Sequence, residues 1–357
     1  MKVALLISGG VDSSVALYKL VGQGYQVTAF YLKIWLEDEL AHLGTCPWQE
    51  DLSYVQAVCD QLKVPLEVIS FQKEYWERVV AYTLIEIKKG RTPNPDMMCN
   101  QQIKFGVFYE LFAEKFDLIA TGHYAQTISA DGVTHLLQAP DEIKDQTYFL
   151  ARLSQAQLQK ASFPIGHMTK EQVRAQAVQA DLPNKARKDS QGICFLGKLK
   201  FFDFVQHHLG EHPGDLVEYE TGVRLARHKG AWFYTIGQRQ GIGLAGGPWY
   251  VVAKDMSTHT VYISKHYYAA DKKRDQLMVE ELMWISGSGS RLDEPGEFLV
   301  KLRHGPQKIP ATYTPHKDAC ATIQLSRDDQ GIAAGQYAVL YQGNRCVASG
   351  IITDRLP

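Results

Sequence analysis

The most constraining feature of this chain is a junction between a strand and a helix in its first twenty residues. The largely apolar run Lys2–Ile7 suits a buried strand, and apolar residues at helical spacing follow from Val15. Between them lies the turn Ser8–Ser14, with the sequence SGGVDSS. Glycines let the backbone lie against a ligand, and the open N–H groups at a helix start attract negative charge. The junction predicts a cradle for an anion, with phosphate as the best fit.

An acid stands where other phosphate-binding loops have a lysine. A Walker-type loop ends in Gly-Lys-Ser/Thr, whereas this turn carries Asp12. A carboxylate repels a polyphosphate unless Mg²⁺ bridges the two groups. We therefore expect Asp12 to contact Mg²⁺ indirectly, and we predict no metal site built from protein ligands. The alternative is that Asp12 or Ser13 caps the helix.

Length and composition bound the class of protein. The chain has 357 residues, 45% of them hydrophobic, which is enough for two or three domains. Its net charge of −1 gives no overall basic signal for nucleic acid, although a large enzyme can keep its basic surface local. We expect no leader segment and no membrane span, and the six cysteines include no CxxC. A cytoplasmic protein is predicted.

Strand and helix patterns alternate along the first part of the chain. After the first strand and helix, they fall at 25–33, 51–62, 65–71, 74–88, 105–116 and 117–120. This alternation predicts a parallel sheet covered on both faces, with ligands at the carboxyl ends of the strands. A hairpin is expected at 127–139, and further helices are expected from Ser154 and Thr169.

The pattern changes after about residue 211, where short strands separated by Gly and Pro replace the helices. Such strands are typical of an antiparallel barrel. We therefore predict an α/β fold that begins with a Rossmann-like, parallel-sheet, nucleotide-binding catalytic domain at 1–205. A small linking domain would follow at 206–270, and an antiparallel β-barrel would close the chain at 271–357.

Cys99 stands in a setting that suits chemistry, in the run RTPNPDMMCNQ. Pro93 and Pro95 prevent a regular helix there, so Asp96 and Cys99 should lie on a constrained loop or a first helical turn. An acid three residues from a thiol suits proton transfer to or from a nucleophile. The alternative is an ordinary buried cysteine.

Cys194 is the second candidate, in the run DSQGICF. Gly192 permits a tight turn that presents the thiol. Lys185, Arg187 and Lys188 precede it, and their charge favours the thiolate. Here the alternative is a buried cysteine or a solvated basic loop.

Five motifs stand in an order that resembles the tRNA-specific 2-thiouridylases, the MnmA family of the ATP-pyrophosphatase (PP-loop) superfamily. They are SGGVDSS, NPDMMCN at 94–100, TGHYA at 121–125, KDQTYFL at 144–150 and DSQGICF at 189–195. The runs IGQRQGIG at 236–243 and KLRHGPQ at 301–307 also look like that family's. The resemblance therefore covers essentially the whole chain, and it implies that the linking domain at 206–270 binds tRNA.

The resemblance implies a tRNA uridine 2-sulfurtransferase that uses ATP and Mg²⁺ to adenylate the C2 oxygen of a wobble uridine, releasing AMP and pyrophosphate. Sulfur would arrive as a persulfide on Cys194, relayed from a cysteine desulfurase or sulfur-relay protein. Cys99 would then complete the exchange and leave a Cys99–Cys194 disulfide, or act as the nucleophile that releases sulfur. Asp96 would be a general base or orient the uracil. The implied partner is the anticodon stem-loop of tRNAs, with the Lys, Glu and Gln acceptors expected.

The resemblance also implies two binding sets. The nucleotide-binding residues would be Leu6, Ile7, Ser8, Gly9, Gly10, Val11, Asp12, Ser13, Leu32 and Gly122. The tRNA-binding residues would be Asn94, Pro95, Asp96, His123, Lys144, Asp145, Gln146, Arg303, His304 and Gln336, with 94–96 at the target base. These residue types suit contacts to phosphate, ribose and base, and the alternative for each is a solvated surface group.

Two other classes of protein stay open. An ATP-pyrophosphatase synthetase acting on a small molecule would need neither Cys99 nor Cys194. A non-catalytic RNA-binding protein that kept the fold is the other, and the intact SGGVDSS loop with both cysteines argues against it.

Overall fold

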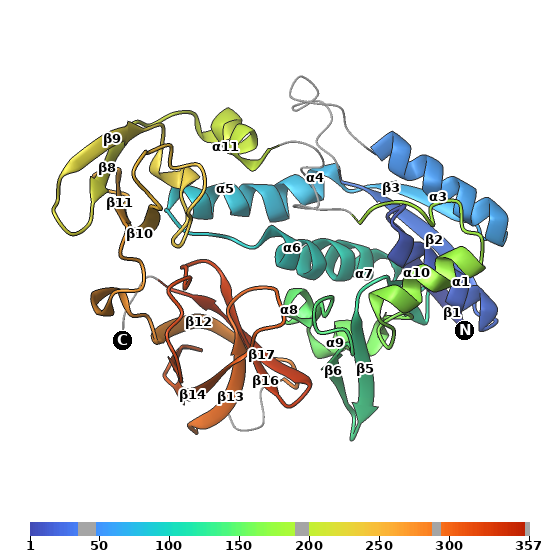
Figure 1. Ribbon diagram of the computed structural model, residues 1–357. Coiled ribbons are helices and arrows are strands. Elements are labelled where there is room, and N and C mark those ends of the chain that lie inside the picture. Colours follow the sequence, from blue (N-terminus) through green and yellow to red (C-terminus); the bar gives the residue numbers. More distant parts are fainter. Residues whose placement is uncertain (35–47, 190–199, 288–293, 354–357) are drawn as a thin grey trace.

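The N-terminal part of the chain forms the parallel sheet that the alternating pattern predicts (Figure 1). The computed structural model describes residues 1–34, 48–189, 200–287 and 294–353. In this sheet the strand order is β3-β2-β1-β4-β7. The bounds are β1 (Lys2–Leu6), β2 (Gln26–Lys33), β3 (Leu66–Ser70), β4 (Leu118–Thr121) and β7 (Ala161–Ser162).

The central strand β1 is buried on both faces. Val3 and Leu5 belong to one apolar cluster, and Ala4 and Leu6 belong to another. Successive side chains of a strand point to opposite faces, so an apolar run is what a strand covered on both sides requires. The predicted two-sided cover is confirmed.

Helices supply that cover. One face carries α1 (Val11–Gly22), α3 (Trp48–Leu62) and α10 (Lys170–Gln179). The other face carries α4 (Gln72–Tyr75), η1 (Trp76–Val80), α5 (Ala81–Lys88), α6 (Pro95–Met98), η2 (Cys99–Val107) and α7 (Phe108–Phe112). In the described part of the chain, no helix has the length and apolar character needed to cross a membrane.

The shorter elements that follow agree with their sequence signals. Capping boxes at Ser154 and Thr169 start α9 (Gln155–Lys160) and α10. Each hydroxyl accepts from the backbone N–H of the glutamine three residues later, and the side chain of that glutamine accepts from the backbone N–H of the capping residue. The other helices here are α8 (Thr147–Leu150) and α11 (Phe201–Leu209). The middle sheet has the order β10-β11-β8-β9 around a small core of its own. Its elements are β8 (Gly214–Glu218), β9 (Arg224–His228), η3 (Ala231–Phe233), β10 (Tyr250–Asp255), β11 (Thr260–Ser264) and η4 (Ala270–Lys272).

The C-terminal strands close into the antiparallel barrel that was predicted. Their order is β12-β15-β14-β13-β16-β17, and pairing between β12 and β17 closes the ring. The bounds are β12 (Gln276–Trp284), β13 (Gly296–Lys301), β14 (Ile309–Pro315), β15 (Ala321–Leu325), β16 (Tyr337–Gln342) and β17 (Arg345–Ile352).

A hairpin from the N-terminal part joins this barrel, which the sequence pattern did not indicate. It consists of β5 (Ala125–Ala130) and β6 (Val133–Gln138), and its turn at Asp131 and Gly132 has φ of 51° and 77°. β6 pairs with β17 through Leu137 opposite Arg345. Figure 1 shows the hairpin extending beside β16 and β17.

A buried ion pair also ties the two parts together. The Nζ atom of Lys301, on β13, lies 2.8 Å from a carboxylate oxygen of Asp145, and the two side chains are 1% and 0% exposed. Asp145 also accepts from the Nε2 of Gln138 and the hydroxyl of Thr147. A contact between Asp145 and tRNA would therefore have to act through its neighbours.

Removing one partner of this pair should be costly. Lys301→Met leaves the Asp145 carboxylate buried without its cation, so we expect a loss of about 3–5 kcal/mol in the free energy of unfolding. Urea unfolding followed by circular dichroism measures it. The exposed Lys317→Met is the matched control, with an expected change within about 0.5 kcal/mol. Equal stability of the two variants would contradict the prediction.

Candidate active site

The turn after β1 has the open geometry that an anion cradle needs. Gly9 has a φ of 77°, and a Cβ at this position would lie 2.7 Å from the carbonyl oxygen of Asp51. Gly10 is the N-cap of α1 and receives no side-chain cap. Among the described residues, neither Asp12 nor Ser13 caps the helix, which removes the simpler interpretation of the loop. The helix start therefore faces the site with its N–H groups uncapped.

The predicted nucleotide-binding residues lie together at the carboxyl edge of the sheet. A Cβ on Gly122, which follows β4, would lie 2.7 Å from the backbone nitrogen of Ser13, so this close approach requires glycine. The N–H of Ile7 donates to the carbonyl of Phe30, which places the loop beside the end of β2, where Leu32 lies. The structure thus brings the stretch from Leu6 to Ser13 close to the carboxyl ends of β2 and β4, the two strands beside β1.

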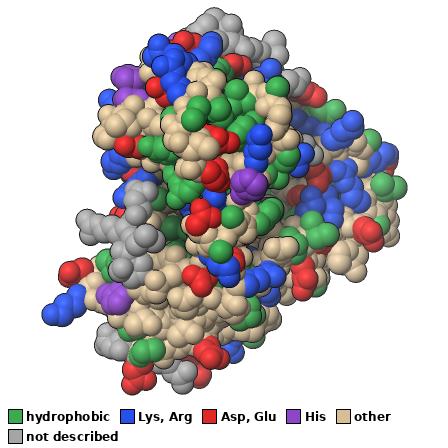
Figure 2. Space-filling model, turned by 60° about the vertical axis from the view of Figure 1, so that its left-hand side comes forward, with side chains coloured by type: hydrophobic (Ala, Val, Ile, Leu, Met, Phe, Trp, Pro, Cys, Tyr) green, Lys and Arg blue, Asp and Glu red, His purple; other side chains and the backbone are tan. Residues whose placement is uncertain are grey.

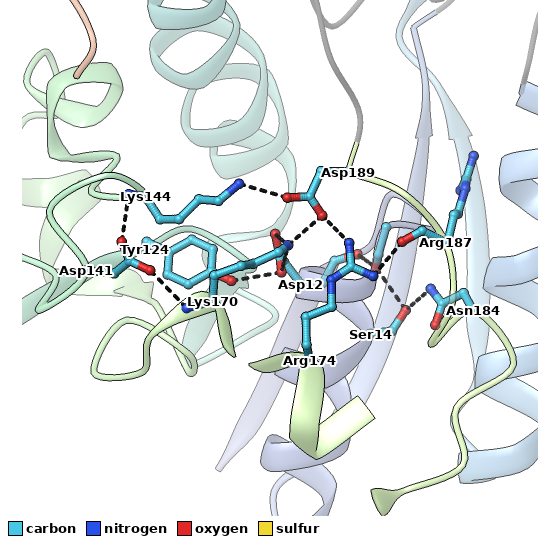
Figure 3. Close-up of polar contacts among 12 residues, drawn as sticks. Asp12, Ser14, Tyr124, Asp141, Lys144, Lys170, Arg174, Asn184, Arg187 and Asp189 are labelled. Carbon is cyan, nitrogen blue, oxygen red and sulfur yellow. Dashed lines mark hydrogen bonds and ion pairs between the residues drawn. The ribbon is translucent and has the colours of Figure 1, made fainter. Parts of the chain in front are cut away.

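Asp12 is paired with a lysine that the sequence did not single out (Figure 3). The Nζ atom of Lys170 lies 2.7 Å and 2.9 Å from the two carboxylate oxygens of Asp12. The hydroxyl of Tyr124 donates to the same carboxylate at 2.9 Å. The acid in the loop is therefore neutralised by the protein itself.

Asp189 is the second acid at this site. Lys144 and Lys170 place their Nζ atoms 2.7 Å and 2.8 Å from its carboxylate, and Arg174 also pairs with it. Burial raises the pKa of the Asp189 carboxyl, but the lysines outweigh this effect and hold the pKa well below its ordinary value. Lys144, a predicted tRNA-binding residue, is thus held beside the nucleotide loop.

The other side of the loop is fixed by polar contacts from the segment before Asp189. Asn184 is buried, and its Nδ2 donates at 2.8 Å to the carbonyl of Gly9 and at 2.8 Å to the hydroxyl of Ser14. Arg187 donates to the same carbonyl at 3.0 Å and pairs with Asp51. The predicted effect of Arg187 on Cys194 stays a prediction, because Cys194 lies outside the described residues.

These residues fit a polyphosphate, because uncapped N–H groups, hydroxyls and lysines converge at one edge of the sheet. Within the described ranges, no group of three or more His, Cys, Asp or Glu side chains is placed to hold a metal ion. The loop offers a phosphate-bound Mg²⁺ one carboxylate, that of Asp12, and Lys170 contacts both of its oxygens.

Cys99 lies one turn inside a helix that starts earlier than predicted. Pro95 occupies the first position of α6, where a proline costs no hydrogen bond, and Asn94 caps the helix by accepting from the N–H of Met97 at 3.1 Å. The expectation that the helix begins near 105 was therefore wrong. Asp96 lies in the first turn, as predicted, and Cys99 begins the π-helical stretch η2.

The Cys99 thiol is buried beside a cation. Its side chain is 1% exposed. Burial raises the pKa of the thiol, Lys104 lowers it, and Asp96 raises it further, with a net increase. Lys104 donates to Asn100 at 2.9 Å.

His123 belongs to the same neighbourhood. Burial and the Lys104 cation hold its pKa well below the ordinary value, so the ring is neutral at pH 7. Its Nδ1 lies 2.8 Å from the hydroxyl of Thr121 at the end of β4. The same Lys104 cation therefore acts on the Cys99 thiol and on His123, which directly follows Gly122.

The remaining predicted tRNA-binding residues are spread over the joint between the domains. Gln336 donates at 3.0 Å to the carbonyl of Thr92, just before the segment 94–96. Arg303 pairs with Asp329 at 2.6 Å, and the ring of His304 packs 4.9 Å from that of Phe149. Gln146 accepts from the N–H of Tyr124.

A surface cleft of about 670 Å³ passes over this joint. Its walls come from all three parts of the chain and include Thr92, Tyr267, Tyr268, Arg303, Arg327 and Gln336. Arg303 and Gln336 therefore share one cleft, whereas Lys144 lies beside Asp189. The cleft passes next to the loop that leads to Cys99.

Several residues at the site were missed by sequence reasoning. They are Lys104, Tyr124, Lys170, Arg174 and Asn184. Lys170 follows the capping threonine Thr169, and that spacing was interpreted only as a helix start. Nothing in the local sequence indicates that its side chain reaches Asp12.

The fold and the site define an α/β protein with a candidate nucleotide site and an appended β-barrel. Residues 1–198 match the family model described as tRNA methyl transferase HUP domain. Residues 202–265 match the tRNA methyl transferase PRC-barrel domain, and residues 274–352 match the aminomethyltransferase beta-barrel domain.

Close relatives give the family. A tRNA-specific 2-thiouridylase MnmA of Parabacteroides distasonis is 43% identical over 99% of both chains. One of Porphyromonas gingivalis is 45% identical, again over 99% of each. The chain therefore belongs to the tRNA-specific 2-thiouridylase family, which confirms the resemblance. A solved 4-thiouridine synthetase–RNA complex with bound ATP is 15% identical, with a TM-score of 0.38, over 57% of this chain and 49% of that one.

The environment of Cys99 predicts its pH response. Because burial raises the pKa of the thiol, Cys99 should be protonated at neutral pH and alkylate slowly. Lys104→Met removes a cation that lowers this pKa, so the alkylation profile should move to higher pH. Mass spectrometry of the Cys99 peptide across a pH series measures it. Lys104→Arg keeps the charge and should keep the profile; an unmoved profile in Lys104→Met would contradict the assignment.

Proposed function

We propose that this protein is an ATP-dependent tRNA uridine 2-sulfurtransferase that acts on the wobble uridine. The observation that carries the proposal is the placement of Cys99. Lys104 acts on the pKa of the buried Cys99 thiol and on that of His123, which directly follows Gly122 of the nucleotide site, in a chain whose relatives are named tRNA-specific 2-thiouridylases. Activation of an oxygen by a nucleotide and replacement of that oxygen by sulfur need these two sites side by side.

The cradle supports ATP as the activating substrate. Its phosphates would lie against the N-terminus of α1 and the hydroxyls of Ser8 and Ser13, which lie 3.3 Å apart. Asp12 would contact the Mg²⁺ of the nucleotide indirectly, because magnesium in proteins keeps several waters and few protein ligands when phosphate is present. Attack on the uridine C2 then expels AMP in place of a poor leaving oxygen.

The sulfur chemistry requires two thiols. Cys194 would carry the persulfide and Cys99 would resolve it, and the terminal sulfur of Cys194 would come from a cysteine desulfurase or sulfur-relay protein. Burial raises the pKa of the Cys99 thiol, so Cys99 must lose its proton to a base before it can attack as a thiolate. Asp96, in the first turn of α6, would orient the uracil or accept its proton.

The cleft at the domain joint is where we place the tRNA. Tyr268 lies on the wall of the cleft and is 75% exposed. Its ring centroid lies 5.1 Å from that of Tyr267, and the ring of Tyr267 stacks on that of Tyr250 with their centroids 4.7 Å apart. Aromatic rings beside arginines suit unpaired bases such as those of an anticodon loop. On the face drawn in Figure 2, acidic and basic side chains are interspersed, and basic ones gather at the top and at the right, so the basic surface is local.

The proposal is tested by making thiouridine from defined components. Wild-type protein with ATP, Mg²⁺, a persulfide source and unmodified tRNA should form 2-thiouridine, read by nucleoside mass spectrometry. Cys99→Ser and Cys194→Ser should form none. Pyrophosphate release without thiouridine, unaffected by either substitution, would instead identify a small-molecule synthetase.

The cleft predicts a separate effect on RNA binding. Tyr268→Ala removes a stacking platform worth about 1–3 kcal/mol, so tRNA should bind about 5- to 150-fold more weakly. Fluorescence anisotropy at fixed salt measures the dissociation constant. Tyr268→Phe should bind like wild type, and Tyr219→Ala, outside the cleft, is the control. Normal affinity in Tyr268→Ala would show that the RNA does not bind on this wall of the cleft.

A further inference from the structure

Lys170 holds a fixed position beside the nucleotide loop. It is the first residue of α10, its N–H donates to Asp141 at 3.0 Å, and the capping box of Thr169 fixes the helix start. Its side chain is 15% exposed. Figure 3 shows the ammonium group between the carboxylates of Asp12 and Asp189.

We propose that Lys170 is the polyphosphate-binding lysine of this site, contributed by α10 in place of the lysine that other phosphate loops carry within the loop itself. The inference rests on the proposed use of ATP. A polyphosphate in the cradle meets the carboxylate of Asp12, and the two repel each other. The ammonium of Lys170 has three donors, so it can hold Asp12 and a phosphate oxygen together.

Asp189 competes with the nucleotide for this lysine. In the structure its carboxylate takes the position of an anion among Lys144, Lys170 and Arg174. A phosphate oxygen that binds Lys170 must replace part of the contact between Lys170 and Asp189. The affinity for ATP therefore has two opposed contributions, one from Lys170 and one from Asp189, and substitutions at the two positions should act in opposite directions.

The test is ATP binding without turnover. Calorimetry with ATP and Mg²⁺, in the absence of tRNA, should show Lys170→Gln binding at least about tenfold more weakly than wild type. Lys170→Arg should recover most of the affinity, and Asp189→Asn should bind more tightly than wild type. The exposed Lys73→Gln is the control for a lost lysine.

Two further measurements separate phosphate binding from a structural role. Adenosine has no phosphate, so its affinity should be the same in Lys170→Gln and wild type, and the melting temperature of the free variant reports separately the stability that Lys170 adds by pairing with Asp12 and Asp189. Equal losses for ATP and adenosine, or unchanged ATP binding in Lys170→Gln, would overturn the proposal, as would weaker binding in Asp189→Asn. Wild type that fails to bind ATP would overturn both this inference and the proposed function. Wild type that binds ATP but forms no thiouridine would overturn the proposed function and leave the role of Lys170 standing.

Discussion

The buried ion pair between Asp145 and Lys301 is the charged contact at the joint between the α/β domain and the barrel, where apolar side chains of both parts share one cluster. Both side chains are withdrawn from water, so each charge relies on the other and on the hydrogen bonds around it. Tyr148 adds a hydrogen bond from its hydroxyl to the carbonyl of Tyr337 on β16. Because the cleft has one wall on the barrel and another at Thr92, this joint sets where a substrate lies relative to Cys99.

The candidate site is built from charges that neutralise one another before any ligand arrives. Lys170 neutralises Asp12, three cations surround Asp189, and burial keeps the Cys99 thiol protonated beside Lys104. An isolated charge at a partly buried position is costly, so the free protein holds these groups in pairs. Binding an anionic substrate then rearranges existing pairs and need not create charge in a dry site.

Local patterns predicted the local structure well, and long-range contacts lay beyond them. The turn after Ile7, the hairpin at Asp131 and the capping box at Thr169 each depend on a few neighbouring residues, and all formed as expected. The start of the Cys99 helix was misplaced because Pro95 was interpreted as a breaker, although it fits a first helical position. The reach of Lys170 to Asp12 joins residues 158 positions apart, and no local spacing encodes such a contact.

One continuous segment connects the nucleotide loop to the barrel. It begins at Gly122, whose backbone lies against Ser13, then runs out through the hairpin that pairs with β17. It returns to Lys144, which pairs with Asp189, and ends at Asp145 in the buried ion pair with β13. Both ends of the hairpin therefore contact the nucleotide site while its middle belongs to the barrel sheet. The segment from Gly122 to Asp145 therefore fixes the position of the nucleotide loop relative to the barrel.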